Sequence, residues 1–156
     1  MALKEGNKAP NFVLQDTEGN EVQLSDFMGN PVVLLFFPLA FSEVCTRELC
    51  TARDNMKLFE SLNAKILAIS VDSFFTLKEF KRSHNINFTL LSDFNREVSQ
   101  KYETLYHDYY GMKGVAKRSA HIVDSKGIIQ YREVLDNSSE LPDFDAIQTK
   151  LQELLS

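Results

Sequence analysis

Hydrophobic positions change their spacing along the chain, and these changes predict an alternation of strands and helices. Residues 32–37 are wholly apolar and residues 64–71 mostly so, which is typical of strands buried on both faces of a sheet. Residues 44–61, between them, carry apolar side chains at roughly helical spacing and are otherwise polar. The centre of the chain therefore predicts a strand, a helix and a second strand in succession.

Shorter patterns on both sides complete the expected order. Turn-forming residues separate two short strands near the N-terminus, and Asp124-Ser125-Lys126-Gly127 separates two others, so both pairs are expected to form hairpins. The strands are expected at 11–15, 22–24, 88–91, 119–123 and 128–134, and the helices at 73–81, 92–102 and 142–155. This order predicts an α/β protein, a mixed sheet with helices on both faces, in one domain over residues 1–156.

Composition narrows the function classes. The chain has 156 residues, 44% hydrophobic and 25% charged, with a formal net charge of −5. This charge argues against nucleic-acid binding, and the apolar runs are too short to span a bilayer. The N-terminal segment has no apolar stretch of the kind found in secretory signals, so we expect a cytoplasmic protein.

The two cysteines of the chain, Cys45 and Cys50, lie where the central apolar run gives way to a helix. Ligand sites in open α/β sheets favour this edge. The first turn of a helix offers free N–H groups and partial positive charge, which favour a thiolate. Ser42 stands at an N-cap position before Cys45, and Pro38 ends the strand without a donor N–H. The pattern predicts that Cys45 is a reactive thiol, ionised at neutral pH.

Cys50 allows two interpretations. In a helix, residues five positions apart have Cα atoms roughly 8–9 Å apart, whereas a disulfide tolerates about 7 Å. A Cys45–Cys50 bond therefore requires the first turns of the helix to unwind. The alternative is that Cys50 is a small apolar core residue.

The segment from Pro38 to Cys45, PLAFSEVC, resembles the peroxiredoxin signature: a proline, a Thr or Ser four residues later, and the peroxidatic cysteine three beyond. FFPLAFSEVC is most similar to the alkyl hydroperoxide reductase E-type members. CTRELC resembles the bacterioferritin comigratory type, whose resolving cysteine follows five residues after the first. Further similar segments are GNKAPNFVL at 6–14, AISVDS at 68–73, LLSD at 90–93 and KRSAHIVDSKGIIQY at 117–131.

The resemblance implies a thioredoxin-like fold with an N-terminal β-hairpin, and reduction of hydrogen peroxide and organic hydroperoxides without metal, flavin or other cofactor. It makes Cys45 the nucleophile that becomes a sulfenic acid. Arg118 would hold the thiolate and the peroxide, Ser42 would hydrogen-bond the peroxide, and Pro38 would shield the sulfenate. The backbone N–H groups of Val44 and Cys45 would stabilise charge on the peroxide oxygens. Glu48 would orient the arginine.

Several alternatives remain open at this point. Cys50 would resolve the sulfenic acid as an intramolecular disulfide recycled by thioredoxin, or an external thiol would resolve it instead. A thioredoxin-type oxidoreductase normally separates its two cysteines by two residues, whereas four intervene here. A peroxide sensor would share the first chemical step. Two cysteines without a second ligand pair do not favour zinc. His121 is expected to be a neutral strand histidine, and the E-type resemblance implies a homodimer.

Overall fold

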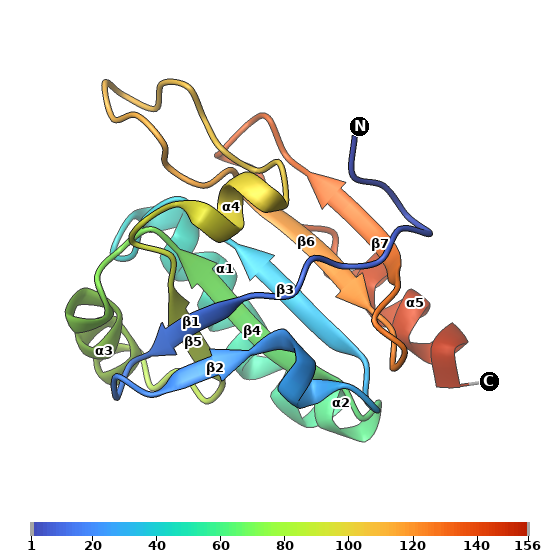
Figure 1. Cartoon of the computed structure of the whole chain (residues 1–156). Coiled ribbons are helices and arrows are strands. Elements are labelled where there is room, and N and C mark those ends of the chain that lie inside the picture. Colours follow the sequence, from blue (N-terminus) through green and yellow to red (C-terminus); the bar gives the residue numbers. More distant parts are fainter. Residues whose placement is uncertain (1, 156) are drawn as a thin grey trace.

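The computed structural model describes residues 2–155, and in this part of the chain seven strands form one mixed sheet (Figure 1). The strand order is β2-β1-β5-β4-β3-β6-β7. The strands are β1 (Val13–Asp16), β2 (Glu21–Gln23), β3 (Val32–Phe36), β4 (Lys65–Ser70), β5 (Thr89–Ser92), β6 (Ser119–Val123) and β7 (Ile129–Val134). Both hairpins predicted from the turn residues are present, as the antiparallel pairs β1–β2 and β6–β7.

The central strand of the site is β3, and all five of its residues are buried. It pairs in parallel with β4 and antiparallel with β6. Because β3 is covered on both faces, its sequence is an apolar run without alternation, as predicted. The helices are α1 (Glu43–Asp54), α2 (Met56–Ser61), α3 (Phe74–Ser83), α4 (Glu97–Lys101) and α5 (Phe144–Leu155), with a 3₁₀ turn η1 (Leu24–Phe27).

Two hydrophobic clusters lie on opposite faces of the sheet. One joins alternate β3 side chains, Val33 and Leu35, to the buried stripes of α1, α2, α3 and α5. The other joins Val32, Leu34 and Phe36 to α4 and the N-terminal segment. The ribbon shows α4 on its own side of the sheet (Figure 1). The expected mixed sheet with helices on both faces is confirmed.

The helix expected over 44–61 is instead two helices, with a break at Asn55. This residue has φ −105° and ψ 11°, and its side-chain amide donates to the carbonyl of Thr51 at 2.8 Å. Short polar side chains that bond to nearby backbone groups compete with the helical pattern. The apolar stripe continues across the break, from Ala52 to Met56 and Phe59, so hydrophobic spacing alone did not reveal it.

The helix expected from residue 92 is shorter than predicted, because it begins at Glu97. Arg96, directly before it, has a left-handed backbone with φ 65°. The carboxylate of Asp93 accepts the N–H groups of Val98 at 3.1 Å and Ser99 at 2.7 Å. Asp93 therefore satisfies the donors at the start of this helix from outside it, and the intervening residues form a turn.

Candidate functional site

The connection from β3 to α1 places Cys45 in the first turn of α1. Ser42 occupies the N-cap position with extended φ −73° and ψ 152°, and its carbonyl accepts the first helical hydrogen bond, from Thr46, at 2.9 Å. Cys45 is fully buried against β3 and α3. Pro38, between the strand and this turn, is also buried. The thiol thus lies beyond the carboxyl end of the central strand, as predicted.

The side chain of Arg118 reaches the sulfur from the neighbouring strand. Arg118 directly precedes β6, whose first residue Ser119 pairs with Phe36 at the end of β3, so the two strand ends meet. Its Nη2 lies 3.3 Å from Cys45 Sγ, and its Nη1 lies 2.5 Å from Glu48 Oε1. Nη2 also donates to the carbonyl of Ser138 at 3.0 Å. The guanidinium is buried and is shared by a thiol, a carboxyl group and a backbone carbonyl.

The Ser42 side chain does not cap the helix, although Ser42 stands at the N-cap. Its hydroxyl donates to the carbonyl of Leu39 at 2.8 Å, and no helical N–H bonds to it. The same hydroxyl and the backbone N–H of Leu39 also lie near the Cys45 sulfur, where both favour a lower pKa of the thiol. The expectation of a hydroxyl beside the sulfur is therefore met, but with a different partner for the serine.

The expected depression of the Cys45 pKa is not found in this reduced arrangement. Burial raises the pKa of the thiol above its ordinary value, because a thiolate loses its hydration there. Arg118 opposes this effect, and so do the hydrogen bonds from Ser42 and Leu39, whereas the charge of Glu48 reinforces it. The helix end and the guanidinium are both in place, but desolvation outweighs them. The sequence indicated the groups that favour a thiolate, but it could not show how deeply the Cys45 side chain is buried.

Glu48 is fully buried one helical turn after Cys45. Burial raises the pKa of its carboxyl group to about 7, although Arg118 lowers it by charge and hydrogen bond. Within the described residues Oε2 has no hydrogen-bond partner, so one side of the carboxylate is unsolvated and unpaired. A group of this kind changes charge near neutral pH, next to the guanidinium that also faces the thiol.

The raised pKa of Glu48 predicts a pH-dependent stability. The folded-state pKa of about 7 exceeds the ordinary value of 4.5, so the stability that this group contributes is complete below pH 4.5. It is lost as pH rises through 7. We expect the free energy of unfolding to fall by on the order of 3 kcal/mol between pH 5 and 8 from this group. Glu48→Gln should remove most of this slope in urea titrations at pH 5, 6, 7 and 8. Equal slopes for both proteins would contradict the assignment.

Cys50 lies on the same continuous helix as Cys45 and is partly exposed. Both cysteines belong to the described part of the chain, and both are free thiols. α1 is intact from residue 43 to residue 54, so the reduced protein has the helical arrangement predicted around the two sulfurs. Any bond between them requires this segment to change.

The remaining histidines do not join the site. His121 is buried, contacts Ser119 Oγ at 3.0 Å and Arg132 Nη1 at 3.3 Å, and burial lowers its pKa to about 3. It is neutral, as expected. His107 is exposed, and His84 packs against Phe80.

In residues 2–155 no group of three or more His, Cys, Asp or Glu side chains could hold a metal ion. The same residues contain no helix that is both long and apolar enough to cross a membrane.

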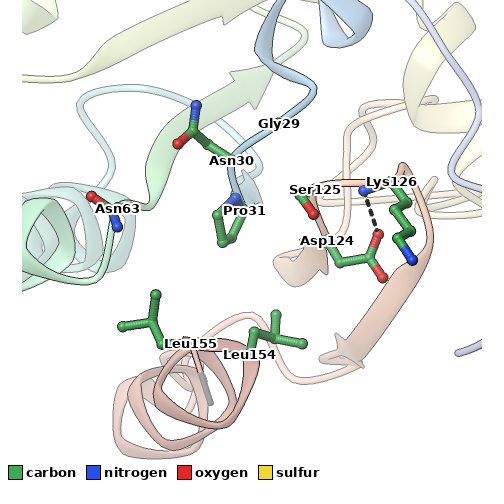
Figure 2. A pocket seen from close by; sticks show the side chains of 9 residues that line it. All are labelled: Gly29, Asn30, Pro31, Asn63, Asp124, Ser125, Lys126, Leu154 and Leu155. Atoms are coloured by element: carbon green, nitrogen blue, oxygen red, sulfur yellow. Dashed lines mark hydrogen bonds between the residues drawn. The ribbon is translucent and has the colours of Figure 1, made fainter.

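A cavity of about 330 Å³ lies at the other end of β3 (Figure 2). It is lined by the turn before β3, the turn after β6 and the end of α5, including Pro31, Asp124 and Leu154. Because Cys45 follows the opposite end of β3, this cavity contributes no group to the thiol site.

Comparison with known proteins identifies the family of the chain. The model of the AhpC/TSA family matches residues 6–132, a segment that holds both cysteines, Glu48 and Arg118. The chain belongs to the AhpC/TSA family. Its resemblance to peroxiredoxins is thereby confirmed.

Relatives and solved structures of this family agree with the fold. Peroxiredoxin Q, chloroplastic, of Oryza sativa subsp. japonica is 36% identical over 129 residues, covering 83% of this chain and 58% of the rice protein. The chain thus spans less than two thirds of that relative. The crystal structure of peroxidoxin BcpB from Mycobacterium tuberculosis has TM-score 0.89 and 26% identity, covering 99% of both chains. Reduced Plasmodium vivax 2-Cys peroxiredoxin has TM-score 0.86 and 29% identity, covering 97% of this chain and 81% of that one. The thioredoxin-like fold expected from the sequence is confirmed.

Three groups around the thiol were not identified from the sequence. They are the carbonyl of Ser138, the N–H of Leu39 and the carboxylate of Asp72, which accepts the N–H of Ala40. Two of these are backbone groups, which nearly every residue type offers, so the sequence gives no sign of their role. Asp72 was visible only as part of the AISVDS segment, without an assigned role.

Proposed function

We propose that this AhpC/TSA family member is a thiol-dependent peroxidase that reduces hydrogen peroxide and organic hydroperoxides through Cys45. The observation that carries the proposal is the 3.3 Å contact between Cys45 Sγ and the buried guanidinium of Arg118, in the first turn of α1. A guanidinium beside a sulfur stabilises both a thiolate and the negative charge that develops on a peroxide oxygen.

The proposed first step consumes one thiol and one hydroperoxide. The sulfur attacks one peroxide oxygen, an S–O bond forms and the O–O bond breaks. Sulfur is oxidised by two electrons to a sulfenic acid, and the departing alkoxide takes a proton to leave as an alcohol, or as water from hydrogen peroxide. Because burial holds the pKa of the reduced thiol high, loss of the thiol proton accompanies peroxide entry in this scheme.

The other groups act by position. Ser42 would offer its hydroxyl to the incoming peroxide, and the N–H groups of Val44 and Cys45, at the start of α1, would face the developing charge. Pro38 would cover the sulfenate with a buried ring that lacks an N–H. The site needs no metal or organic cofactor for this chemistry. Glu48 accepts a hydrogen bond from Nη1 of Arg118, the guanidinium nitrogen next to the one that contacts Cys45, and so fixes the orientation of the guanidinium.

The second step is proposed to use Cys50 and thioredoxin. The Cys50 thiol attacks the Cys45 sulfenic acid, the S–O bond breaks and water leaves. The resulting disulfide is a substrate for a dithiol reductant, and forming it must unwind the first turns of α1. After one equivalent of hydrogen peroxide we expect mass spectrometry to find an intramolecular Cys45–Cys50 disulfide. We expect amides 43–52 to exchange with solvent at least roughly ten times faster than in the reduced protein.

Cys50→Ser is the matched control for this step. It should stop at a sulfenic acid on Cys45 and lose turnover with thioredoxin. A sulfenic or sulfinic Cys45 with a free Cys50 in the wild type would instead assign resolution to an external thiol. Insulin reduction without peroxide consumption would indicate a disulfide oxidoreductase, and a single turnover with any small reductant would indicate a sensor.

We also propose a cytoplasmic homodimer as the working form. Its support is the E-type resemblance and the apolar surface of the loop before β6, where Tyr110 is 84% exposed and Met112 40% exposed. Aromatic side chains and methionine are enriched at the cores of protein interfaces.

A further inference from the structure

Asp72 lies just beyond the end of β4, next to the loop that joins β3 to α1. Its Oδ2 accepts the N–H of Ala40 at 2.8 Å and the hydroxyl of Ser70 at 2.7 Å. Its own N–H donates to Ser70 Oγ at 3.2 Å, and its carbonyl accepts the hydroxyl of Ser92 at 2.6 Å. Ser70 is fully buried, so the end of β4 fixes the carboxylate, while Ser92 at the end of β5 fixes the backbone of Asp72.

The N–H that Asp72 holds belongs to the peptide group between Leu39 and Ala40. The carbonyl of that same peptide group accepts the hydroxyl of Ser42 at 2.8 Å. A trans peptide is planar, and its N–H and C=O point in opposite directions. Fixing one end of the plane therefore fixes the direction of the other, and with it the rotamer of the hydroxyl beside Cys45.

The loop needs such a restraint. Phe41, between Ala40 and Ser42, has φ 70°, a left-handed conformation that is unfavourable for a bulky side chain. Its ring packs edge-on against Phe80, with centroids 5.1 Å apart, but remains 50% exposed. The partly buried, charge-assisted hydrogen bond from the N–H of Ala40, the residue before Phe41, to the Asp72 carboxylate stabilises this loop conformation.

We propose that Asp72 is a positioning residue for the thiol site. Its carboxylate fixes the Leu39–Ala40 peptide, and through the carbonyl of that peptide it holds the Ser42 hydroxyl beside the Cys45 sulfur. Asp72 does not touch the sulfur or the peroxide. The consequence for peroxide reduction rests on the proposed function, but the effect on Cys45 is measurable without any peroxide.

The test measures the rate of Cys45 alkylation by iodoacetamide from pH 5 to 10, in a Cys50→Ser background so that one thiol reacts. Asp72→Ala should raise the apparent thiol pKa, and should slow alkylation at pH 7 by roughly 3- to 10-fold. Asp72→Asn keeps an oxygen that can accept the Ala40 N–H and should return the rate to within about 2-fold of the parent. Adding Ser42→Ala to Asp72→Ala should cost less than the two separate effects combined, because they act through one path.

Asp124→Asn is the matched control. Asp124 Oδ1 accepts the N–H of Lys126 at 2.9 Å (Figure 2) and that of Ile128 at 3.0 Å. This β6–β7 turn follows the end of β6 opposite to Ser119, which pairs with β3 near the thiol site. This variant should lower thermal stability without changing the alkylation profile. Ser70→Ala, which removes one restraint on the carboxylate, should shift the profile in the same direction as Asp72→Ala. If Asp72→Ala does not fold, the alkylation profile of Ser70→Ala tests the positioning role in its place.

A profile unchanged in Asp72→Ala or Ser70→Ala, with lowered stability alone, would overturn the positioning role. So would equal shifts in Asp72→Asn and Asp72→Ala, since the retained acceptor would then be irrelevant. Hydroperoxide consumption by the unaltered protein is measured in parallel. Its absence, with the Asp72 effect on alkylation present, would reject the proposed peroxidase and leave the positioning role standing.

Discussion

Replacing Cys45 by serine is expected to lower hydroperoxide reduction by roughly 10³-fold or more, because an alcohol of similar size is a far weaker nucleophile than a thiol. The side chain is fully buried, and serine is close to it in volume, so the fold should persist. The measurement is consumption of hydrogen peroxide and of an alkyl hydroperoxide by the Cys45→Ser protein with thioredoxin, thioredoxin reductase and NADPH.

Cys50→Ser gives the comparison within the same helix. It should keep the first oxidation of Cys45 at nearly the parental rate and lose turnover with thioredoxin, so the two cysteines differ in which step they affect. Full activity in Cys45→Ser would reject the proposed nucleophile. A circular dichroism spectrum matching that of the parent protein establishes that lost activity does not reflect lost folding.

Replacing Arg118 by methionine is expected to damage both stability and chemistry. Without the guanidinium, which lowers the pKa of Glu48, the buried carboxyl group takes up a proton at neutral pH and loses its hydrogen-bond partner, which should lower the free energy of unfolding by roughly 1–3 kcal/mol. The replacement also removes the one group within 3.3 Å of the sulfur that carries positive charge in the described structure. The rate of Cys45 oxidation should fall by about 100-fold or more. Urea unfolding and stopped-flow oxidation of Cys45 measure the two effects.

A double variant separates these effects. Arg118→Met with Glu48→Gln also removes the carboxyl group that lost its partner and its need to take up a proton, so part of the lost stability should return. The oxidation rate should stay low, because the guanidinium is still missing beside Cys45. Recovery of both stability and rate in the double variant would make Arg118 a structural residue and remove the main support for the proposed chemistry.

The shared guanidinium gives the site its electrostatic character. Arg118 faces Cys45 and Glu48 at once, and burial raises the pKa of both acids. One positive charge cannot fully stabilise two buried negative charges, so ionisation of either group disfavours the other. A neutral Glu48 leaves the arginine more available to the thiolate. The balance of charge at Cys45 therefore depends on a carboxyl group one helical turn away.

Local sequence predicted the elements that have strong periodic signals. The buried strand β3, the two hairpins, the helix capped by Ser73 and the site after the central strand all appear where residue spacing placed them. Two helix boundaries were wrong, at Asn55 and before Glu97. Both were set by side-chain hydrogen bonds, donated by Asn55 in one case and accepted by Asp93 in the other, which hydrophobic spacing does not record.

The sequence by itself determined the order of the elements, the residue types of the site and the family to which they belong, because these follow from periodicity and from motifs along the chain. The tertiary structure decided how deep Cys45 lies, which groups share Arg118, and that Asp72 reaches the loop from 32 residues away. Burial and long-range hydrogen bonds arise when β3, β4 and β6 pair side by side. The energy of the thiolate depends on those contacts, and no spacing along the chain contains them.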